Sequence, residues 1–241
     1  MSKIKQLKKT IRWLIGDRRA YSGLLSYAEY ERGSENWLKA AERHFGGISR
    51  NVQRRKSSPH DPRTEAKLKT GGMIGGDRMA HHGYSKHYSK HLSPFLADNR
   101  KVIVEVGILK GTGLAVWSLL FPHAKIVGMD IDPSHFRENE DALRARGAFS
   151  LNEPPIIVFD QLVPDLTKLN EVLRDDRIEI FCDDGLHSDE AIMNTLRAVR
   201  PYLAENFVYF IEDNETVARK IEAEMPDLKI FSYDKLTVLE N

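Results

Sequence analysis

The spacing of apolar residues changes near residue 101. Upstream, residues 3–45 carry apolar side chains at helical spacing, beginning with an amphipathic stripe through Ile4, Leu7 and Ile11. Downstream, short apolar runs alternate with helical stripes as far as the C-terminus. This alternation predicts an α/β domain built on a doubly wound, mostly parallel sheet, with a helical extension in front of it.

Five apolar runs rich in β-branched and aromatic residues predict the strands of that sheet. They are Val102–Val106, Lys125–Met129, Ile156–Phe159, Ile178–Cys182 and Phe207–Ile211. Helical stripes predict helices over residues 114–121, 135–146, 166–173, 188–203 and 217–225. Two further short strands fall within residues 229–239. We expect the five strands in the order 3-2-1-4-5, with the C-terminal pair adding an edge.

The segment between the two regions has little periodic pattern. Residues 46–76 are polar, basic and rich in glycine, which predicts a linker or a mobile loop. Tyr84, Tyr88 and Leu92 then fall at i, i+4 and i+8, which places them on one face of a helix. The segment GGDRMAHHGYSKHYSKHL, residues 75–92, holds four histidines, but without cysteine or an HExxH pattern we do not expect a metal there.

Composition limits the class of protein. With 241 residues, 41 % of them apolar, the chain has room for one sizeable α/β domain and an addition. Its one cysteine, Cys182, excludes an internal disulfide and indicates a reducing compartment. The first 16 residues interleave basic with apolar positions, which suits neither a signal peptide nor a membrane span. We therefore expect a cytoplasmic protein.

Charge is unevenly distributed, although the net charge is only +1. Residues 1–70 hold 17 Lys and Arg against 7 Asp and Glu, and the remainder holds 19 against 28. A basic arm of this kind suits contact with a polyanion or an anionic membrane surface. A solvated helical face that packs on a more acidic partner subunit explains it equally well, and we favour this second interpretation.

A glycine turn follows the first predicted strand. Gly107 and Gly111 let the backbone bend sharply and approach a ligand, and the helix that follows directs unpaired N–H groups at it. Asp130 ends the second strand, where doubly wound sheets bind ribose hydroxyls. The middle glycine of the G-x-G-x-x-G dinucleotide pattern is missing and Glu105 precedes the turn, which argues against a dinucleotide.

Polar side chains also end the other three strands. Asp160 and Gln161 follow the third strand, where an acid is well placed to accept from the amino group of a base. Asp183 and Asp184 follow the fourth strand, and Glu212 with Asp213 the fifth. In the order 3-2-1-4-5 these last two strands are neighbours, so we expect their acids to converge.

Converging carboxylates repel one another unless a cation neutralises them, and oxygen ligands suit Mg²⁺. The alternative is that they cap the following helices. We favour capping for Asp183, and a metal site for Asp184, Glu212 and Asp213 together. His187 lies three residues after Asp184; a lone histidine is more often structural, but beside a metal it can act as a general base.

The motifs EVGILKGTG, GMDID, FDQ, DDGLH and IEDN, in this order, resemble those of the metal-dependent macrolide-sugar and rhamnosyl O-methyltransferases, whose relatives include cephalosporin hydroxylase-like proteins. The segment DRMAHHGYSKHY resembles the one that closes over the cofactor in that family. The resemblance covers roughly residues 74–239. Thr112-Gly113 replaces a common Gly-Ser, and Leu186 a small residue.

The resemblance implies a Rossmann-like methyltransferase that uses S-adenosyl-L-methionine and Mg²⁺ to methylate a sugar hydroxyl. It implies His187 as the catalytic base. It implies metal ligands at Asp184, Glu212 and Asp213, and cofactor contacts at Glu105, Gly107, Gly111, Asp130, Asp160 and Gln161.

The resemblance also divides the chain into three parts. We expect a basic helical extension with a mobile loop at 1–73, a segment that closes over the cofactor at 74–98, and the methyltransferase domain at 99–241. The expected partners are a small-molecule or glycan acceptor and further copies of the chain. The alternative is a nucleic-acid-binding protein or RNA methyltransferase that uses the basic arm, but the acidic second half and the lack of a stacking motif argue against nucleic acid.

Overall fold

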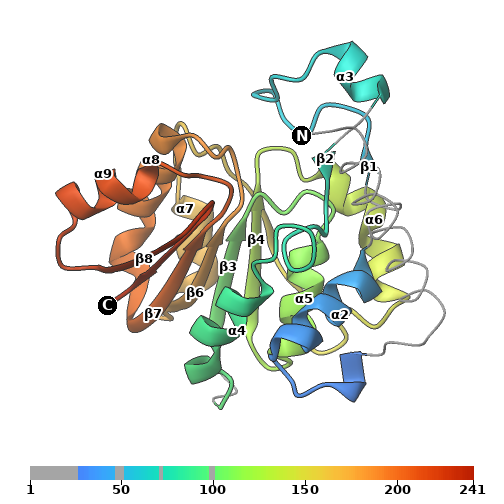
Figure 1. The fold of residues 1–241 in the computed structure, drawn as a ribbon, viewed down its shortest axis with the longest axis horizontal. Coiled ribbons are helices and arrows are strands. Elements are labelled where there is room, and N and C mark those ends of the chain that lie inside the picture. The colour runs from blue at the N-terminus through green and yellow to red at the C-terminus, as the bar shows by residue number, and fades with distance from the viewer. Residues whose placement is uncertain (1–26, 47–51, 71–72, 98–100) are drawn as a thin grey trace.

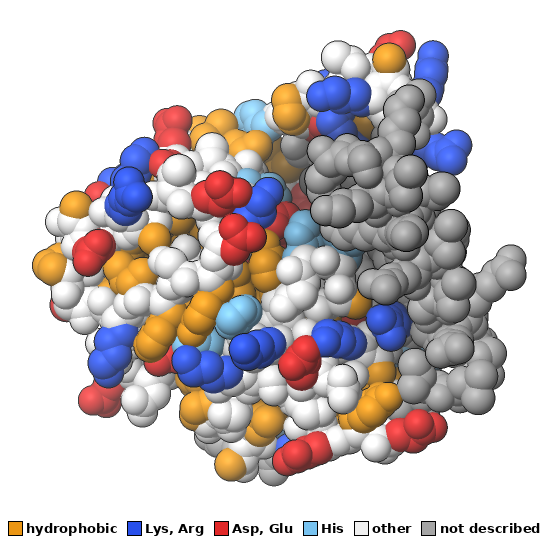
Figure 2. Space-filling model, in the orientation of Figure 1, with side chains coloured by type: hydrophobic (Ala, Val, Ile, Leu, Met, Phe, Trp, Pro, Cys, Tyr) orange, Lys and Arg blue, Asp and Glu red, His pale blue; other side chains and the backbone are white. Residues whose placement is uncertain are grey.

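The computed structural model of the protein describes residues 27–46, 52–70, 73–97 and 101–241 (Figure 1 and Figure 2). The predicted amphipathic stripe that begins at Ile4 lies outside these residues. The N-terminal region contributes η1 (Tyr27–Glu29), α2 (Glu35–Phe45), β1 (Val52–Gln53), α3 (Glu65–Thr70), β2 (Met73–Ile74), α4 (Ser85–Leu92) and η2 (Ser93–Phe95).

A seven-stranded sheet forms the centre of the fold. Its strands are β3 (Val102–Val106), β4 (Lys125–Asp130), β5 (Ile156–Val158), β6 (Ile178–Asp183), β7 (Leu203–Ile211), β8 (Lys229–Tyr233) and β9 (Leu236–Glu240). The order is β5-β4-β3-β6-β7-β9-β8. The first five strands are parallel, and β9 is antiparallel to both β7 and β8. The predicted doubly wound sheet with order 3-2-1-4-5 and a C-terminal edge pair is therefore confirmed.

Helices cover both faces of this sheet (Figure 1). They are α5 (Thr112–Leu120), α6 (Ser134–Arg144), α7 (Thr167–Leu173), α8 (Asp189–Val199), η3 (Arg200–Tyr202) and α9 (Val217–Glu224). Ile103 belongs to the core cluster that contains residues of α2, α4, α5 and α6, whereas its neighbour Val104 belongs to the cluster that contains residues of α7, α8 and α9. Successive strand residues point to opposite faces, so a continuous apolar run is needed to fill both cores.

Two predicted boundaries differ from the structure around Pro201. The helix predicted to reach Leu203 ends at Val199 and continues as η3, because proline cannot donate the backbone hydrogen bond that an α-helix requires. Strand β7 then begins at Leu203 instead of Phe207. Glu205 and Asn206 are exposed in its first half and obscure the apolar pattern.

The region predicted as a linker contains short regular elements. Val52 pairs with Ile74 and Gln53 with Met73 in an antiparallel ladder, and α3 lies between the two strands. Two-residue strands are too short to produce a periodic pattern. The mobility of residues 46–72 stays a prediction. No helix in the described part of the chain is long and apolar enough to cross a membrane.

Two glycines provide a matched test of packing at the glycine turn. Gly111 (φ 76°) precedes α5, and a Cβ there would clash with the ring of Phe136, whereas Gly147 (φ 92°) has open space around the same position. Gly147→Ala should cost about 1–2 kcal/mol of unfolding free energy, since it adds only left-handed strain. Gly111→Ala should cost roughly 1–3 kcal/mol more through overpacking. Denaturant unfolding of both variants measures this; equal losses would contradict the packing at Phe136.

Candidate functional site

The carboxyl ends of three central strands meet at one edge of the sheet. The Asp184 N–H donates to the Val106 carbonyl at 2.9 Å, and the Glu212 N–H donates to the Asp183 carbonyl at 2.9 Å. These bonds continue the ladder past the ends of β3, β6 and β7. They bring the acids that follow β6 next to those that follow β7, as the predicted strand order requires.

Asp184, His187 and Asp213 form a compact group at this edge. One ligand atom from each lies within 4.8 Å of the others, and no other such group of three occurs among the described residues. The backbones of His187 (φ 56°) and Asp213 (φ 54°) both lie in the left-handed region, which residues other than glycine rarely adopt. Strained backbone of this kind is concentrated at functional sites.

The imidazole of His187 has a defined orientation. Its Nδ1 lies 3.2 Å from the Glu212 carbonyl, so Nδ1 carries the proton and donates. Its Nε2 lies 3.9 Å from Asp184 Oδ1. Burial lowers the pKa of His187. The ring is therefore neutral at neutral pH, with the lone pair of Nε2 turned toward the group.

Glu212 does not join this group. Its side chain is 2 % exposed, accepts a hydrogen bond from the Tyr88 hydroxyl and lies 2.5 Å from Nε of Arg78. Burial raises the pKa of Glu212. Of the three predicted metal ligands, the structure brings Asp184 and Asp213 together with His187 and holds Glu212 behind them.

Arg78 is the residue that sequence reasoning missed. Its guanidinium donates to Glu105 at 2.6 Å and to Asp184 at 3.1 Å, in addition to its ion pair with Glu212. It lies over the rings of Tyr88 and Trp117, at 5.8 and 5.6 Å from their centroids. The only sequence signal was its place in the segment DRMAHHGYSKHY.

The predicted helical face at Tyr84 and Tyr88 has a second use. Both rings are buried, and Tyr84 lies just before α4 rather than within it. The Tyr84 hydroxyl donates to Asp213 at 2.6 Å, and the Tyr88 hydroxyl donates to Glu212. The same side chains therefore fill the core and hold the acids.

Glu42 of α2 holds the preceding turn in place. Its buried carboxylate accepts from the N–H groups of Met79 and Ala80, at 2.8 and 3.1 Å. Burial raises the pKa of Glu42 to about 7. The N-terminal region thus fixes the position of Arg78, one residue before Met79.

Two cavities of about 340 and 350 Å³ open at the strand ends. The Arg78 cavity is lined by Glu105, Thr112, Arg78, His82 and Asp213, and the Asp130 cavity by Val106, Asp130, Phe159, Asp160 and Leu186. Gly107, Leu109, Asp184 and His187 line both. The two cavities are therefore adjacent, and the His187 group lies where they meet.

Gly107 and Asp130 shape this junction. Gly107 has φ 82°, and a Cβ there would clash with the Asp184 backbone. Asp130 accepts from the N–H groups of Leu109 at 3.0 Å and Asp132 at 2.9 Å. Burial raises the pKa of Asp130 to about 6. Gly111, in contrast, lines neither cavity, and its predicted contact with the cofactor stays a prediction.

Asp160 and Gln161 follow β5 but differ in availability. The amide nitrogen of Gln161 donates to Asp183 and Thr195, and its oxygen accepts from the Leu186 N–H at 2.7 Å. Gln161 therefore holds the loop after β6. Asp160 accepts from the Leu162 N–H and lies 3.4 Å from Nε2 of His60 at the mouth of the Asp130 cavity.

The two carboxylates of this group fit a divalent cation. Asp184 and Asp213 supply carboxylate oxygens, which hard cations prefer. Burial and the nearby Glu212 carboxylate raise the pKa of Asp184, and the Arg78 guanidinium opposes that shift.

No family model matches the chain. It is 28% identical over 141 residues to demethylmacrocin O-methyltransferase of Streptomyces fradiae, and 29% identical over 140 residues to mycinamicin VI 2''-O-methyltransferase of Micromonospora griseorubida. Each match covers 55% of this chain but only 32% and 31% of the relatives. The chain thus spans about a third of the length of the curated relatives it matches.

Among solved structures, the chain is similar to MycE methyltransferase from the mycinamycin biosynthetic pathway in complex with Mg, SAH and mycinamycin VI. The TM-score is 0.52 at 20% identity, covering 67% of this chain and 49% of that chain. MycE with Mg and SAH gives a TM-score of 0.50 at 20% identity, covering 67% and 50%. The likeness shows that this chain has a Rossmann-like methyltransferase fold.

Proposed function

We propose that this protein is an S-adenosylmethionine- and Mg²⁺-dependent O-methyltransferase that acts on a sugar hydroxyl. The observation that carries the proposal is the junction of the two cavities, where Asp184, His187 and Asp213 converge. The printed names of the two curated relatives, both O-methyltransferases, support the reaction. The Mg and SAH bound to MycE support the two cofactors.

The cofactor would span both cavities. Its nucleoside would occupy the Asp130 cavity, where the Asp130 carboxylate would accept from ribose hydroxyls and Asp160 would lie at the edge of the base. Its amino-acid end would lie in the Arg78 cavity, which offers a guanidinium and the Glu105 carboxylate. When bound, S-adenosylmethionine supplies an electrophilic methyl group. Gly107 leaves space at the passage between the cavities.

Asp184 and Asp213 would hold the metal ion. Glu212, the third carboxylate of the predicted set, is paired with Arg78 and Tyr88 and would reach an ion only on leaving Arg78. When bound, Mg²⁺ lowers the pKa of a hydroxyl as a Lewis acid. A vicinal diol, with two oxygens to present, is the acceptor we expect.

His187 would remove the acceptor proton. Its Nδ1–H is engaged by the Glu212 carbonyl, which leaves Nε2 as the accepting atom. The lowered pKa keeps the ring neutral and ready to accept at neutral pH. Asn214 donates to the His187 carbonyl at 2.9 Å and supports the strained loop that presents the ring.

Binding of the cofactor product should depend on Asp130. Asp130→Ala should weaken S-adenosylhomocysteine binding roughly 10- to 100-fold, since hydrogen bonds to a charged group contribute about 1.5–3 kcal/mol. Asp130 accepts as a carboxylate only above its pKa of about 6, so wild-type affinity should fall as the pH drops through 6. Calorimetric titration of wild type, Asp130→Ala and Asp130→Asn across pH measures both effects. Unchanged affinity in Asp130→Ala would refute the nucleoside site.

Removal of His187 should reduce chemistry and leave cofactor binding intact. We expect His187→Ala to lose about 10²- to 10⁴-fold in rate, the usual contribution of a general base. His123, an exposed histidine before β4, gives the matched control His123→Ala, which should keep the wild-type rate. A variant His187→Ala with full activity would exclude this residue as the base.

The reaction itself can be tested by transfer of a labelled methyl group from S-adenosylmethionine to a panel of deoxysugar glycosides with vicinal hydroxyls. EDTA should abolish transfer, because the acids at the junction would then lack their cation, and added Mg²⁺ should restore it. Full-speed transfer by the chelated enzyme would remove the metal from the proposal.

A further inference from the structure

Residues 55–63, the cap segment, supply part of the lining of the Asp130 cavity. Ser57, Ser58, His60 and Pro62 line the cavity together with Phe159 and Gly185 of the sheet edge. His60 Nε2 lies 3.4 Å from Asp160 Oδ2, so the segment also contacts the residue that ends β5. One wall of this cavity therefore comes from outside the α/β domain.

The cap segment is folded around a buried carboxylate. Asp61 is 6 % exposed and accepts from the Ser57 N–H at 2.9 Å and from the Arg63 N–H and Nε at 3.0 and 2.9 Å. Arg63 holds the pKa of Asp61 well below its ordinary value. Lys56 Nζ donates to the Asp61 carbonyl at 2.7 Å. These contacts give the segment a defined shape of its own.

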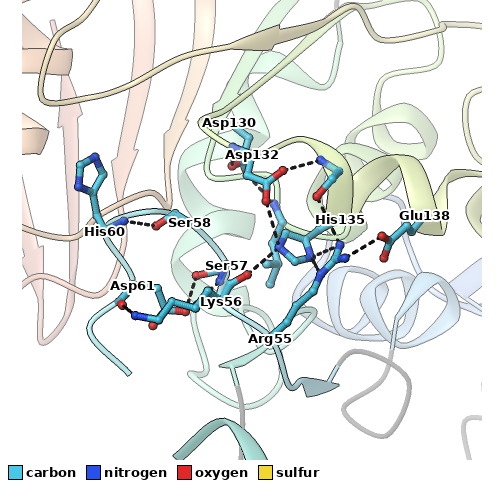
Figure 3. A network of polar contacts seen from close by, with 12 residues as sticks. Arg55, Lys56, Ser57, Ser58, His60, Asp61, Asp130, Asp132, His135 and Glu138 are labelled. Atoms are coloured by element: carbon cyan, nitrogen blue, oxygen red, sulfur yellow. Dashed lines mark hydrogen bonds and ion pairs between the residues drawn. The ribbon is translucent and has the colours of Figure 1, made fainter. Parts of the chain in front are cut away.

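One buried histidine fastens this segment to the domain (Figure 3). Arg55 donates from Nε and Nη2 to His135 Nδ1, at 3.0 and 2.9 Å. His135 Nε2 lies 3.0 Å from the Lys56 carbonyl. Arg55 also pairs with Glu138 of α6 at 2.8 Å. His135 is 2 % exposed, so the segment covers both of its ring nitrogens.

This geometry admits one protonation state of His135. Nδ1 faces two guanidinium donors and must accept, and Nε2 faces a carbonyl and must donate. The ring is therefore neutral, with its proton on Nε2. A second proton would place an N–H against the guanidinium and oppose docking of the segment.

His135 also lies close in sequence to Asp130, the residue proposed to bind the ribose. It follows the turn in which the Asp132 N–H donates to Asp130 Oδ1, and its Nε2 lies 3.7 Å from Asp132 Oδ2. The cap segment is therefore attached at the same turn that presents Asp130 to the cavity. Its other contact, His60, reaches the opposite side of the cavity at Asp160.

We propose that Arg55, acting through His135, is a positioning residue for the cofactor: it holds the cap segment over the nucleoside and so sets the affinity for S-adenosylmethionine and its product. This inference rests on the proposed function, and it adds a determinant of cofactor affinity that lies outside the α/β domain. If the segment is docked in only a fraction of the molecules, the apparent affinity for the cofactor equals the intrinsic affinity multiplied by that fraction. The cap should therefore act on binding rather than on the chemical step.

The first test compares Arg55→Ala with Arg137→Ala. Both arginines pair with acids of α6, but Arg137 pairs with Glu140 and has no contact with the cap segment among the described interactions. Arg55→Ala should weaken S-adenosylhomocysteine binding roughly tenfold, as loss of hydrogen bonds to a charged donor predicts. It should leave kcat at saturating cofactor unchanged, and Arg137→Ala should match wild type in both.

The second test uses His135→Gln and His135→Ala. Glutamine can accept from Arg55 and donate to the Lys56 carbonyl, so it reproduces the neutral ring and should retain affinity, whereas alanine should not. Burial and Arg55 lower the pKa of His135, while Asp132 and Glu138 oppose that shift. Docking is therefore complete at neutral pH and is lost as the pH falls through the range in which His135 charges. At acid pH, His135→Gln should bind S-adenosylhomocysteine more tightly than wild type does. Protonation of Asp130 weakens binding in both proteins and therefore does not cause the difference.

The outcomes separate the two proposals. If wild type fails to bind S-adenosylhomocysteine, the proposed function is wrong. If wild type binds and Asp130→Ala does not, but folded Arg55→Ala and His135→Ala bind as wild type does, the cap segment has no role in affinity. If His135→Gln shows the same pH profile as wild type, or binds as weakly as His135→Ala, docking through the neutral ring is overturned. Thermal unfolding of each variant separates loss of docking from loss of fold.

Discussion

A single buried guanidinium keeps the acids at the sheet edge together. Glu105, Asp184 and Glu212 crowd the ends of three adjacent strands, and carboxylates removed from water are destabilising unless they are paired. Arg78 contacts all three and is itself 7 % exposed. It belongs to a segment that precedes the sheet in sequence. The N-terminal region therefore completes the site, and the α/β domain supplies the acids at the strand ends.

Two packing devices place that region. Tyr84 and Tyr88 bury their rings in the core and donate their hydroxyls to Asp213 and Glu212, so the position of the acids is tied to the packing of α4. Glu42 fixes the turn that carries Arg78 through two backbone N–H groups. Cores tolerate little displacement of large side chains. A shift of α2 or α4 would thus be transmitted directly to the cavity junction.

The alternation of apolar runs was enough to predict the sheet, and parallel strands bring their carboxyl ends to one edge, so the convergence of Asp184 and Asp213 followed from order alone. The orientation of the Glu212 side chain did not follow from strand order, because it depends on Arg78, which is distant in sequence. The pairing of Arg55 with His135 was equally hidden. The cap segment that carries Arg55 has no periodic pattern, and the sequence does not show which distant residue an isolated polar side chain contacts in the folded protein. The place of His187, three residues after Asp184, and the family resemblance together predict it as the base, and that role stays a prediction.

In the proposed function, one ligand spans both cavities beside a cation at their junction. A crystal structure of the protein with Mn²⁺ and S-adenosylhomocysteine tests it directly, because Mn²⁺ is identified by its anomalous scattering. We predict an anomalous peak bound by Asp184 and Asp213, with the nucleoside against Asp130 and the amino-acid end against Arg78. A peak elsewhere, or a ligand outside these two cavities, would contradict the account.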